Sequence, residues 1–406
     1  MKKIEGGVTA ASGFQAAGVY AGIKKVRKDM ALVYSVVPAK GAGTFTTNVV
    51  KAAPVRWDMK VTKESPFVQA VVLNSGVANA CTGTEGEQSN ERMAKAVAEA
   101  MNIPIGAVYT ASTGVIGKQL PIDVIVGGVK LLAADLEEGI QAGAKAAEAI
   151  MTTDTYPKEC AVSFVVGGKE VKLGGMAKGS GMIHPNMATM LGVVTTDLNI
   201  SKELLQEALS ADVKVTFNMI SVDRDTSTND SLLILANGLA GNEEITEKNE
   251  DYEIFCKALN LVTTELSKKM AADGEGATKL FEVEVTGAST WEEASILSKS
   301  IITSNLVKTA VFGNDANWGR ILCAMGYSGI EFDPEKVDLY IESADGKLKL
   351  VENGMATDYS EETATKLLSG KEVKATADLK TGAASATAWG CDFSYDYVKI
   401  NADYRS

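Results

Sequence analysis

Histidine is the residue type that this chain most nearly lacks. Its 406 residues include one histidine, His184. A metal site built from several imidazole ligands is therefore excluded. Any Ser-His-Asp or Cys-His arrangement would have to include that one residue. If the chain is an enzyme with a hydroxyl nucleophile, we expect its general base to be a group other than imidazole.

Further absences narrow the possible settings and partners. No run of roughly eighteen apolar residues occurs, so we expect no membrane association, and the first residues lack the apolar stretch of a secretory signal. No run rich in lysine or arginine is present and the net charge is −12. A negatively charged surface repels the phosphates of nucleic acids, so we expect no nucleic acid partner. The five cysteines are scattered, which indicates a cytoplasmic protein rather than a disulfide framework.

The composition is otherwise that of an ordinary globular protein, with 46% apolar and 23% charged residues. This length allows two or three domains. Short runs rich in Val, Ile, Phe and Thr predict strands over residues 67–73, 161–166, 190–195, 231–235, 281–285, 337–341 and 373–377. Alanine-rich stretches with helical spacing predict helices over residues 91–101, 122–136, 140–151, 201–209, 251–270 and 296–310.

The strands do not alternate one-for-one with helices. Gly167-Gly168 and Asp345-Gly346 each predict a turn between paired strands. We therefore expect a layered α+β architecture with mixed or antiparallel sheets, rather than a doubly wound fold. Ser201 is a suitable first residue for the helix that follows it, and the polar stretch 238–250 is predicted to be a surface loop.

The most unusual stretch is residues 174–192, which contains five glycines and four methionines. By composition alone it is typical of a flexible loop that leads into a buried strand. Glycines flank Lys178, but the GxxxxGK[ST] spacing of a phosphate-binding loop is absent.

The same stretch resembles a known family. Residues 178–191, Lys-Gly-Ser-Gly-Met-Ile-His-Pro-Asn-Met-Ala-Thr-Met-Leu, are similar to the self-cleavage signature of the ornithine acetyltransferases, also called glutamate N-acetyltransferases. Further stretches of the chain also resemble motifs of this family and occur in the family's order: residues 74–83, 112–117, 151–158, 223–230, 273–279, 313–320 and 399–406. Each motif alone is moderately specific, but all of them together in this order are very specific.

The resemblance implies the fold and the processing of the chain. It implies an α+β fold, a layered αββα-type sandwich with a smaller α/β domain, self-processed into two chains. Cleavage between Ala188 and Thr189 would give an alpha chain, residues 1–188, and a beta chain, residues 189–406, that starts at the nucleophile. The two chains would stay bound to each other, and two such protomers would form a heterotetramer.

The implied chemistry suits a chain with a single histidine. In the precursor, the Thr189 hydroxyl would attack the Ala188 carbonyl, and water would hydrolyse the resulting ester. Cleavage leaves Thr189 with a free α-amine, whose ordinary pKa is about 7.7–8.0. Such an amine is a good general base at neutral pH and lies within reach of its own hydroxyl.

The resemblance also implies roles for individual residues. Thr113 and Gly114 match the oxyanion-hole pair, although the residues alone indicate only a Ser-Thr-Gly turn. Lys178 and the hydroxyl-bearing terminus would hold the substrate's α-carboxylate, and Glu275 would hold the cationic amine of ornithine, whereas each charged residue taken singly is typical of a solvated charge. The matched substrate-contacting positions are Thr152, Lys178, Thr189, Glu275, Asn401 and Ser406. Many relatives have threonine where this chain ends in serine, but both carry a hydroxyl.

Other polar residues receive structural interpretations. We expect His184, which precedes Pro185, to be a structural residue of the cleavage loop. Asp223, Asp225 and Asp230 do not have the spacing of a calcium-binding loop, and we expect them to form a hydrogen-bonded turn near the substrate pocket.

The implied reaction moves acetyl from N-acetyl-ornithine to glutamate through an acetyl-Thr189 intermediate, without a metal or a bound organic cofactor. Whether acetyl-CoA also serves as donor is left open by the residues. One rival is an aminopeptidase or amidohydrolase on the same self-cleaving scaffold, in which water would deacylate the nucleophile. A second rival is a non-enzymatic binding protein, which would need no cleavage.

Overall fold

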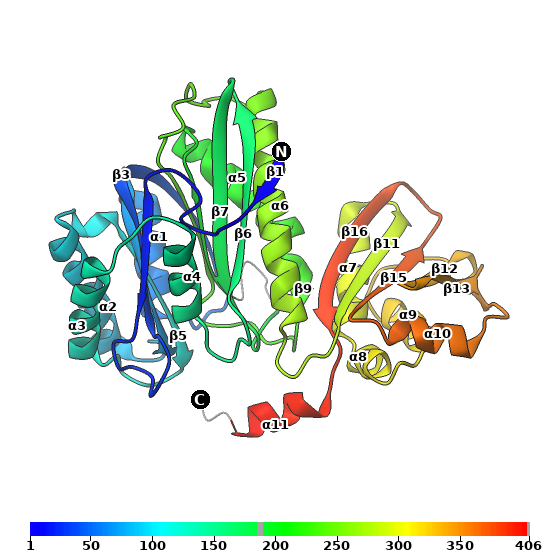
Figure 1. Ribbon diagram of the computed structural model, residues 1–406. Helices are drawn as coiled ribbons and strands as arrows, with labels where there is room; N and C mark the ends of the chain where they lie inside the picture. Colours follow the sequence, from blue (N-terminus) through cyan, green and yellow to red (C-terminus); the bar gives the residue numbers. More distant parts are fainter. Residues whose placement is uncertain (185–189, 404–406) are drawn as a thin grey trace.

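The computed structural model describes residues 1–184 and 190–403, so the predicted residues Ala188, Thr189 and Ser406 lie outside the described residues. Within the described part, strands form two separate sheets (Figure 1). The larger sheet comprises β1 (Lys2–Ile4), β2 (Phe14–Val19), β3 (Met30–Phe45), β4 (Val68–Val77), β5 (Val108–Val115), β6 (Lys158–Val166), β7 (Lys169–Lys178), β8 (Leu191–Thr196) and β10 (Ser231–Ala236).

The long strand β3 joins two halves of this larger sheet. Its first part, up to Ala39, pairs with β2 and β4. Its second part, from Lys40 onwards, pairs antiparallel with β10. The resulting strand order is β1-β6-β7-β8-β10-β3-β4-β5, with β2 beside β3. Because β8 and β10 are parallel and most other pairs are antiparallel, the sheet is mixed, as predicted.

Helices cover both outer faces of the larger sheet (Figure 1). One cluster of buried side chains lies between the two halves and includes Val33, Val71 and Val193. The outward side chains of β3 to β5 pack against α2 and α3, and those of β6, β7, β8 and β10 pack against α5 and α6. These layers confirm the predicted αββα sandwich. The helices are α1 (Ala53–Glu64), α2 (Gly83–Met101), α3 (Ile122–Ala134), α4 (Ile140–Ala149), α5 (Lys202–Val215) and α6 (Glu250–Ala272).

The smaller part of the fold has its own sheet, of order β14-β13-β12-β15-β11-β16-β9, with α7 packed on β11 and β16. Its strands are β9 (Ile220–Ser221), β11 (Leu280–Ala288), β12 (Asp338–Ser343), β13 (Gly346–Glu352), β14 (Met355–Ala356), β15 (Glu372–Asp378) and β16 (Ala384–Cys391). Its helices are α7 (Trp291–Thr303), α8 (Asn305–Phe312), α9 (Trp318–Gly326) and α10 (Glu361–Leu368), and the chain continues into α11 (Tyr395–Asp403).

One predicted helix is wrong in its extent. Residues 296–310 do not form one helix, because the backbone is extended at Ser304 and two helices, α7 and α8, meet there. The Ser304 hydroxyl accepts a hydrogen bond from the Val307 N–H, which makes it the N-cap of α8. The helix start predicted at Ser201 is confirmed, since Ser201 caps α5 in the same way.

Three neighbouring strands, β7, β8 and β10, each have one end at the same end of the sandwich. Lys178, the last residue of β7, pairs with Leu191, the first residue of β8. Leu191 is also the partner of Ser231, the first residue of β10. Lys178 and Leu191, the first and last residues of the predicted self-cleavage signature, therefore lie side by side here. No helix in the described part of the chain is long and apolar enough to cross a membrane.

Candidate active site

A cavity of about 260 Å³ lies at this end of the sandwich. Met190, the residue that follows Thr189 in the chain, contributes to its lining. The cavity brings together every predicted site residue that the structure describes, namely Thr113, Gly114, Thr152, Lys178, Glu275 and Asn401. A larger, more open cavity of about 750 Å³ beside α11 is lined by none of these six residues.

Thr113 and Gly114 reach the cavity from the end of β5. Gly114 pairs with Gly76 of the neighbouring strand β4 and has a φ of +128°. A Cβ at residue 114 would overlap the Gly76 backbone. Glycine is thus required here by the close approach of two strands.

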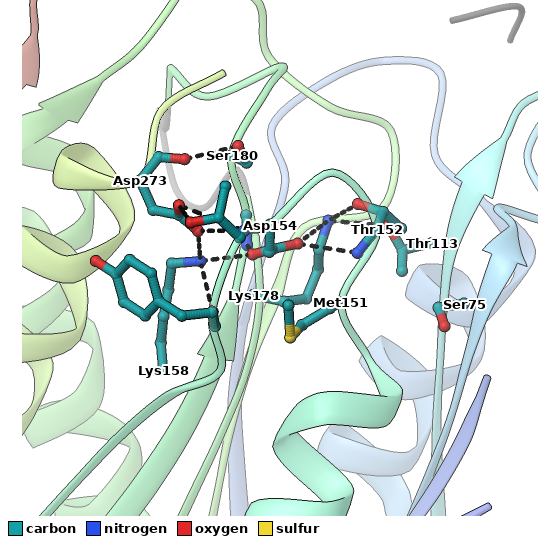
Figure 2. A network of polar contacts seen from close by, with 12 residues as sticks. Ser75, Thr113, Met151, Thr152, Asp154, Lys158, Lys178, Ser180 and Asp273 are labelled. Carbon is teal, nitrogen blue, oxygen red and sulfur yellow. Dashed lines mark hydrogen bonds and ion pairs between the residues drawn. The ribbon is translucent and has the colours of Figure 1, made fainter. Parts of the chain in front are cut away.

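Lys178 is the cation of the cavity and is 7% exposed. Its Nζ donates to the Thr152 hydroxyl over 2.9 Å and to the Thr113 hydroxyl over 3.4 Å. Burial lowers the pKa of this ammonium, and the nearby Asp154 carboxylate opposes that effect. Figure 2 shows these side chains converging from separate segments of the chain. Two of the predicted substrate-contacting residues, Lys178 and Thr152, are therefore in direct contact.

Glu275 is the anion of the cavity and is 9% exposed. It follows the end of α6, and its backbone N–H donates to the Ser180 carbonyl over 3.0 Å. Its carboxylate accepts a hydrogen bond from Asn401 Nδ2 over 2.8 Å. A Cβ at Gly181 would overlap the Glu275 carboxylate, so the small residue leaves room for it. The pocket thus holds a buried positive group and a buried negative group.

Asn229 and Asp230 also line the cavity, and the sequence had predicted neither as a catalytic or substrate-binding residue. Asn229 Nδ2 donates to the Ser112 carbonyl over 2.8 Å and also to the Ala78 carbonyl, which ties the start of β10 to the ends of β4 and β5. Asp230 is 2% exposed, and burial raises its pKa well above the usual range. Their signal in the sequence was the motif at residues 223–230, which had been interpreted only as a turn.

Of the three aspartates expected in a turn, Asp230 instead lines the cavity, and Asp225 donates its backbone N–H to Asp223 Oδ1 over 3.2 Å. The Asp223 carboxylate also accepts hydrogen bonds from the backbone N–H groups of Met182 (2.6 Å) and Ile183 (2.9 Å). His184 lies just beyond, with Nδ1 3.0 Å from the Ser221 hydroxyl oxygen. Burial, assisted by the positive charges of Lys299 and Arg224, lowers the pKa of His184 to about 4. At neutral pH this imidazole is uncharged.

Comparison with known proteins identifies the family. The model of the ArgJ family matches residues 15–406. The chain belongs to the ArgJ family. The resemblance inferred from the sequence motifs is thereby confirmed.

Relatives within the family match along the whole chain. The chain is similar to the arginine biosynthesis bifunctional protein ArgJ of Caldanaerobacter subterraneus subsp. tengcongensis, 50% identical over 406 residues and covering 100% of both chains. It is 52% identical over 394 residues to the arginine biosynthesis bifunctional protein ArgJ 1 of Clostridium acetobutylicum, covering 97% of this chain and 96% of that one. A crystal structure of the Bacillus halodurans arginine biosynthesis bifunctional protein ArgJ is 50% identical, with a TM-score of 0.50, and covers 52% of this chain and 98% of its own.

Proposed function

We propose that this chain is the glutamate N-acetyltransferase of arginine biosynthesis, which transfers acetyl from N-acetyl-ornithine to glutamate. The observation that carries the proposal is the meeting of Thr113, Thr152, Lys178 and Glu275 in one cavity beside Met190. The names of the family's relatives, which are arginine biosynthesis bifunctional proteins, support it.

The two buried charges match the two ends of N-acetyl-ornithine. In the proposal, Lys178 and the Thr152 hydroxyl bind the α-carboxylate, and Glu275 binds the side-chain ammonium. Charge-assisted hydrogen bonds are about twice as strong as neutral ones, and burial strengthens them further. A cavity of about 260 Å³ suits an amino acid better than a peptide.

The proposed nucleophile is Thr189, released as a chain end by cleavage after Ala188. Its α-amine takes the hydroxyl proton as the oxygen attacks the acetyl carbonyl, and it returns that proton to the departing nitrogen of ornithine. The C–N bond breaks, an ester forms, and the amine of glutamate then attacks the ester in the same way. The Thr113 hydroxyl and the Gly114 N–H face the negative oxygen of each tetrahedral intermediate. No proton transfer in this scheme requires a metal or a bound cofactor.

Processing and assembly belong to the same proposal. The Bacillus halodurans chain matches 52% of this chain while being covered over 98% of its own length, which agrees with a relative present as cleaved chains. We propose that residues 1–188 and 189–406 remain together and that two such protomers form a heterotetramer in the cytoplasm. Light scattering on the purified protein, together with denaturing electrophoresis, measures both features.

The function is tested by supplying N-acetyl-ornithine with and without glutamate. A transferase forms N-acetylglutamate and ornithine in equal amounts, and the acetyl-enzyme decays much faster when glutamate is present. Release of ornithine at the same rate in water alone would instead indicate a hydrolase on this scaffold. A third reaction, acetyl-CoA with glutamate and no N-acetyl-ornithine, determines whether the chain also uses that donor.

A further inference from the structure

A buried lysine behind the cavity wall has no role in the proposed reaction. Lys158 is the first residue of β6, and its side chain is 0% exposed. Its Nζ donates to Asp154 Oδ1 over 2.7 Å, to Asp273 Oδ2 over 2.5 Å and to the Tyr156 carbonyl over 3.4 Å. Each of its three ammonium protons therefore has an acceptor. Figure 2 shows Lys158 between the two carboxylates.

Asp154 connects this lysine to the cation side of the cavity. Its carboxylate accepts hydrogen bonds from the backbone N–H groups of Thr152, over 2.9 Å, and Gly179, over 2.7 Å. Thr152 is the residue whose hydroxyl accepts from Lys178, and Gly179 follows Lys178 in the chain. Asp154 Oδ2 also lies 3.9 Å from Lys178 Nζ. Asp154 thus holds both the backbone beside Lys178 and the group to which Lys178 donates.

Asp273 connects the same lysine to the anion side of the cavity. It is the C-cap residue directly after α6, and its backbone carbonyl accepts a hydrogen bond from the Ser180 hydroxyl over 2.6 Å. The carbonyl of Ser180 in turn accepts the N–H of Glu275 over 3.0 Å. Asp273 therefore fixes the short segment that carries Glu275. Lys158 joins these two arms through its ammonium, and Thr155 supports the join by donating its N–H (3.0 Å) and its hydroxyl to the Asp273 carboxylate.

From these contacts we propose that Lys158 is a positioning residue that sets the separation of Lys178 and Glu275. It does so by holding Asp154 and Asp273 against one ammonium group. The proposal rests on the proposed function, in which Lys178 and Glu275 bind the two ends of the donor. The pocket therefore selects donors by the distance between their carboxylate and their ammonium, and it accepts N-acetyl-ornithine in preference to N-acetyl-lysine, which is one methylene longer.

The buried ionic cluster behind the cavity contributes less to stability than its number of contacts suggests. Taking the four charges of Lys158, Lys178, Asp154 and Asp273 out of water carries a large desolvation penalty, and apolar side chains of similar volume often give equal or greater stability. A lysine between two aspartates offers directional bonds instead. Such bonds fix the relative placement of two segments, whereas an apolar contact allows them to slide.

The experiment compares kcat/KM for N-acetyl-ornithine and N-acetyl-lysine, with glutamate as acceptor and rates normalised to the cleaved fraction. One methylene in a fitted pocket is worth about 10–200-fold in discrimination. The proposal expects wild-type enzyme to show discrimination in that range, and Lys158→Met and Lys158→Arg to reduce it by about tenfold. A wild-type enzyme with no transfer from N-acetyl-ornithine would refute the proposed function itself, whatever the variants do.

A matched control separates positioning from stability. Lys308 is also buried, at 2% exposure, and donates to the Cys391 carbonyl over 2.6 Å in the smaller part of the fold. Lys308→Met should lower stability without changing the donor ratio. Equal losses with both donors in Lys158→Met and Lys158→Arg would overturn the proposal.

Removing Lys158 takes away the ammonium that both buried carboxylates share and leaves their two negative charges with Lys178 alone near Asp154, so a variant can fail to fold. Asp273→Asn removes one of the two negative charges that hold the ammonium and keeps an oxygen in its place, so it weakens the Lys158 contact without emptying the site. It serves as the decisive variant in that case. A reduced donor ratio in folded Asp273→Asn supports the proposal. An unchanged ratio, or failure of all three variants to fold, would assign Lys158 to stability alone and overturn the proposal.

Discussion

Asn401 Nδ2 lies 2.8 Å from Glu275 Oε2, although 126 positions separate the two residues in the chain. Asn401 belongs to α11, a helix whose residues are all exposed or half-buried. This contact joins a surface helix to the anion of the cavity. It also explains how a residue so close to the end of the chain reaches the candidate active site.

Asn401→Ala should weaken binding of the donor. A hydrogen bond to a charged group contributes about 1.5–3 kcal/mol, so KM for N-acetyl-ornithine should rise about tenfold or more while kcat changes less. Val398→Ala, a 63% exposed residue of the same helix, is the control and should behave as wild type. Steady-state kinetics measure both constants. A drop in kcat alone would show that Asn401 acts on the chemical step instead.

The purified protein should run as two fragments in denaturing electrophoresis. Sequencing of the later fragment should begin Thr189-Met190-Leu191, because the proposed cut follows Ala188. Thr189→Ala removes the attacking hydroxyl and should give one intact and inactive chain. A different first residue in the later fragment would refute this assignment of the cut.

Thr113→Ala should lower kcat by about 10²–10³ with little change in KM, which is the usual loss for one oxyanion donor. It should also slow self-cleavage, because both reactions pass through a tetrahedral oxyanion. Thr113→Ser retains the hydroxyl and should keep most of the rate. An effect confined to KM would mean that Thr113 only binds substrate.

His184→Gln should retain most of kcat once the enzyme is cleaved. The pKa of His184 is lowered to about 4, mainly by burial, so at pH 7 it is a weak base. The proposed base is the α-amine of Thr189, and the rate should therefore still rise with pH near neutrality. Activity is normalised to the processed fraction, since the substitution alters the loop. A loss of about three orders of magnitude in kcat, or about 4 kcal/mol, would contradict the amine as base.

Glu159 should make the fold less stable as the pH rises from acidic to neutral. Burial raises its pKa to about 7 from an ordinary value of 4.5, with Lys269 opposing the shift. The unfolded chain loses this proton first, so stability is lost as pH rises from 4.5 through 7. Because Glu159 is partly exposed to solvent, we expect its contribution to the free energy of unfolding to be only about 2 kcal/mol. Glu159→Gln cannot ionise and should have a smaller fall in Tm from pH 5 to pH 8, unlike the exposed control Glu64→Gln.

Much of the fold could be predicted from periodicity. The strands predicted at 161–166 and 231–235 lie within β6 and β10, and the turn at Gly167-Gly168 joins β6 to β7. These elements are regular and bury one face or both. β3 was not predicted, because Pro38 interrupts its apolar pattern. The sheet accepts that proline where β3 changes partners, at the register shift between Tyr34 and Ala39.

The residues that line the candidate site could be predicted from the sequence, but the buried contacts that hold them in place could not. Lys178 and Glu275 belong to matched motifs, and the structure places both in the cavity. Lys158 and Asp273 also lie in matched motifs, but 115 positions separate them. Their pairing depends on tertiary structure, which no local spacing reveals.

The order of strands in the larger sheet has a consequence for the cleaved protein. β8 and β10 come after the proposed cut, yet they lie between β7 and β3, which come before it. Neither product could leave without breaking a continuous ladder of hydrogen bonds. Recovery from denaturant would therefore need two polypeptides to meet, and its rate would depend on protein concentration. The uncut Thr189→Ala chain would instead regain its fold at a rate independent of concentration.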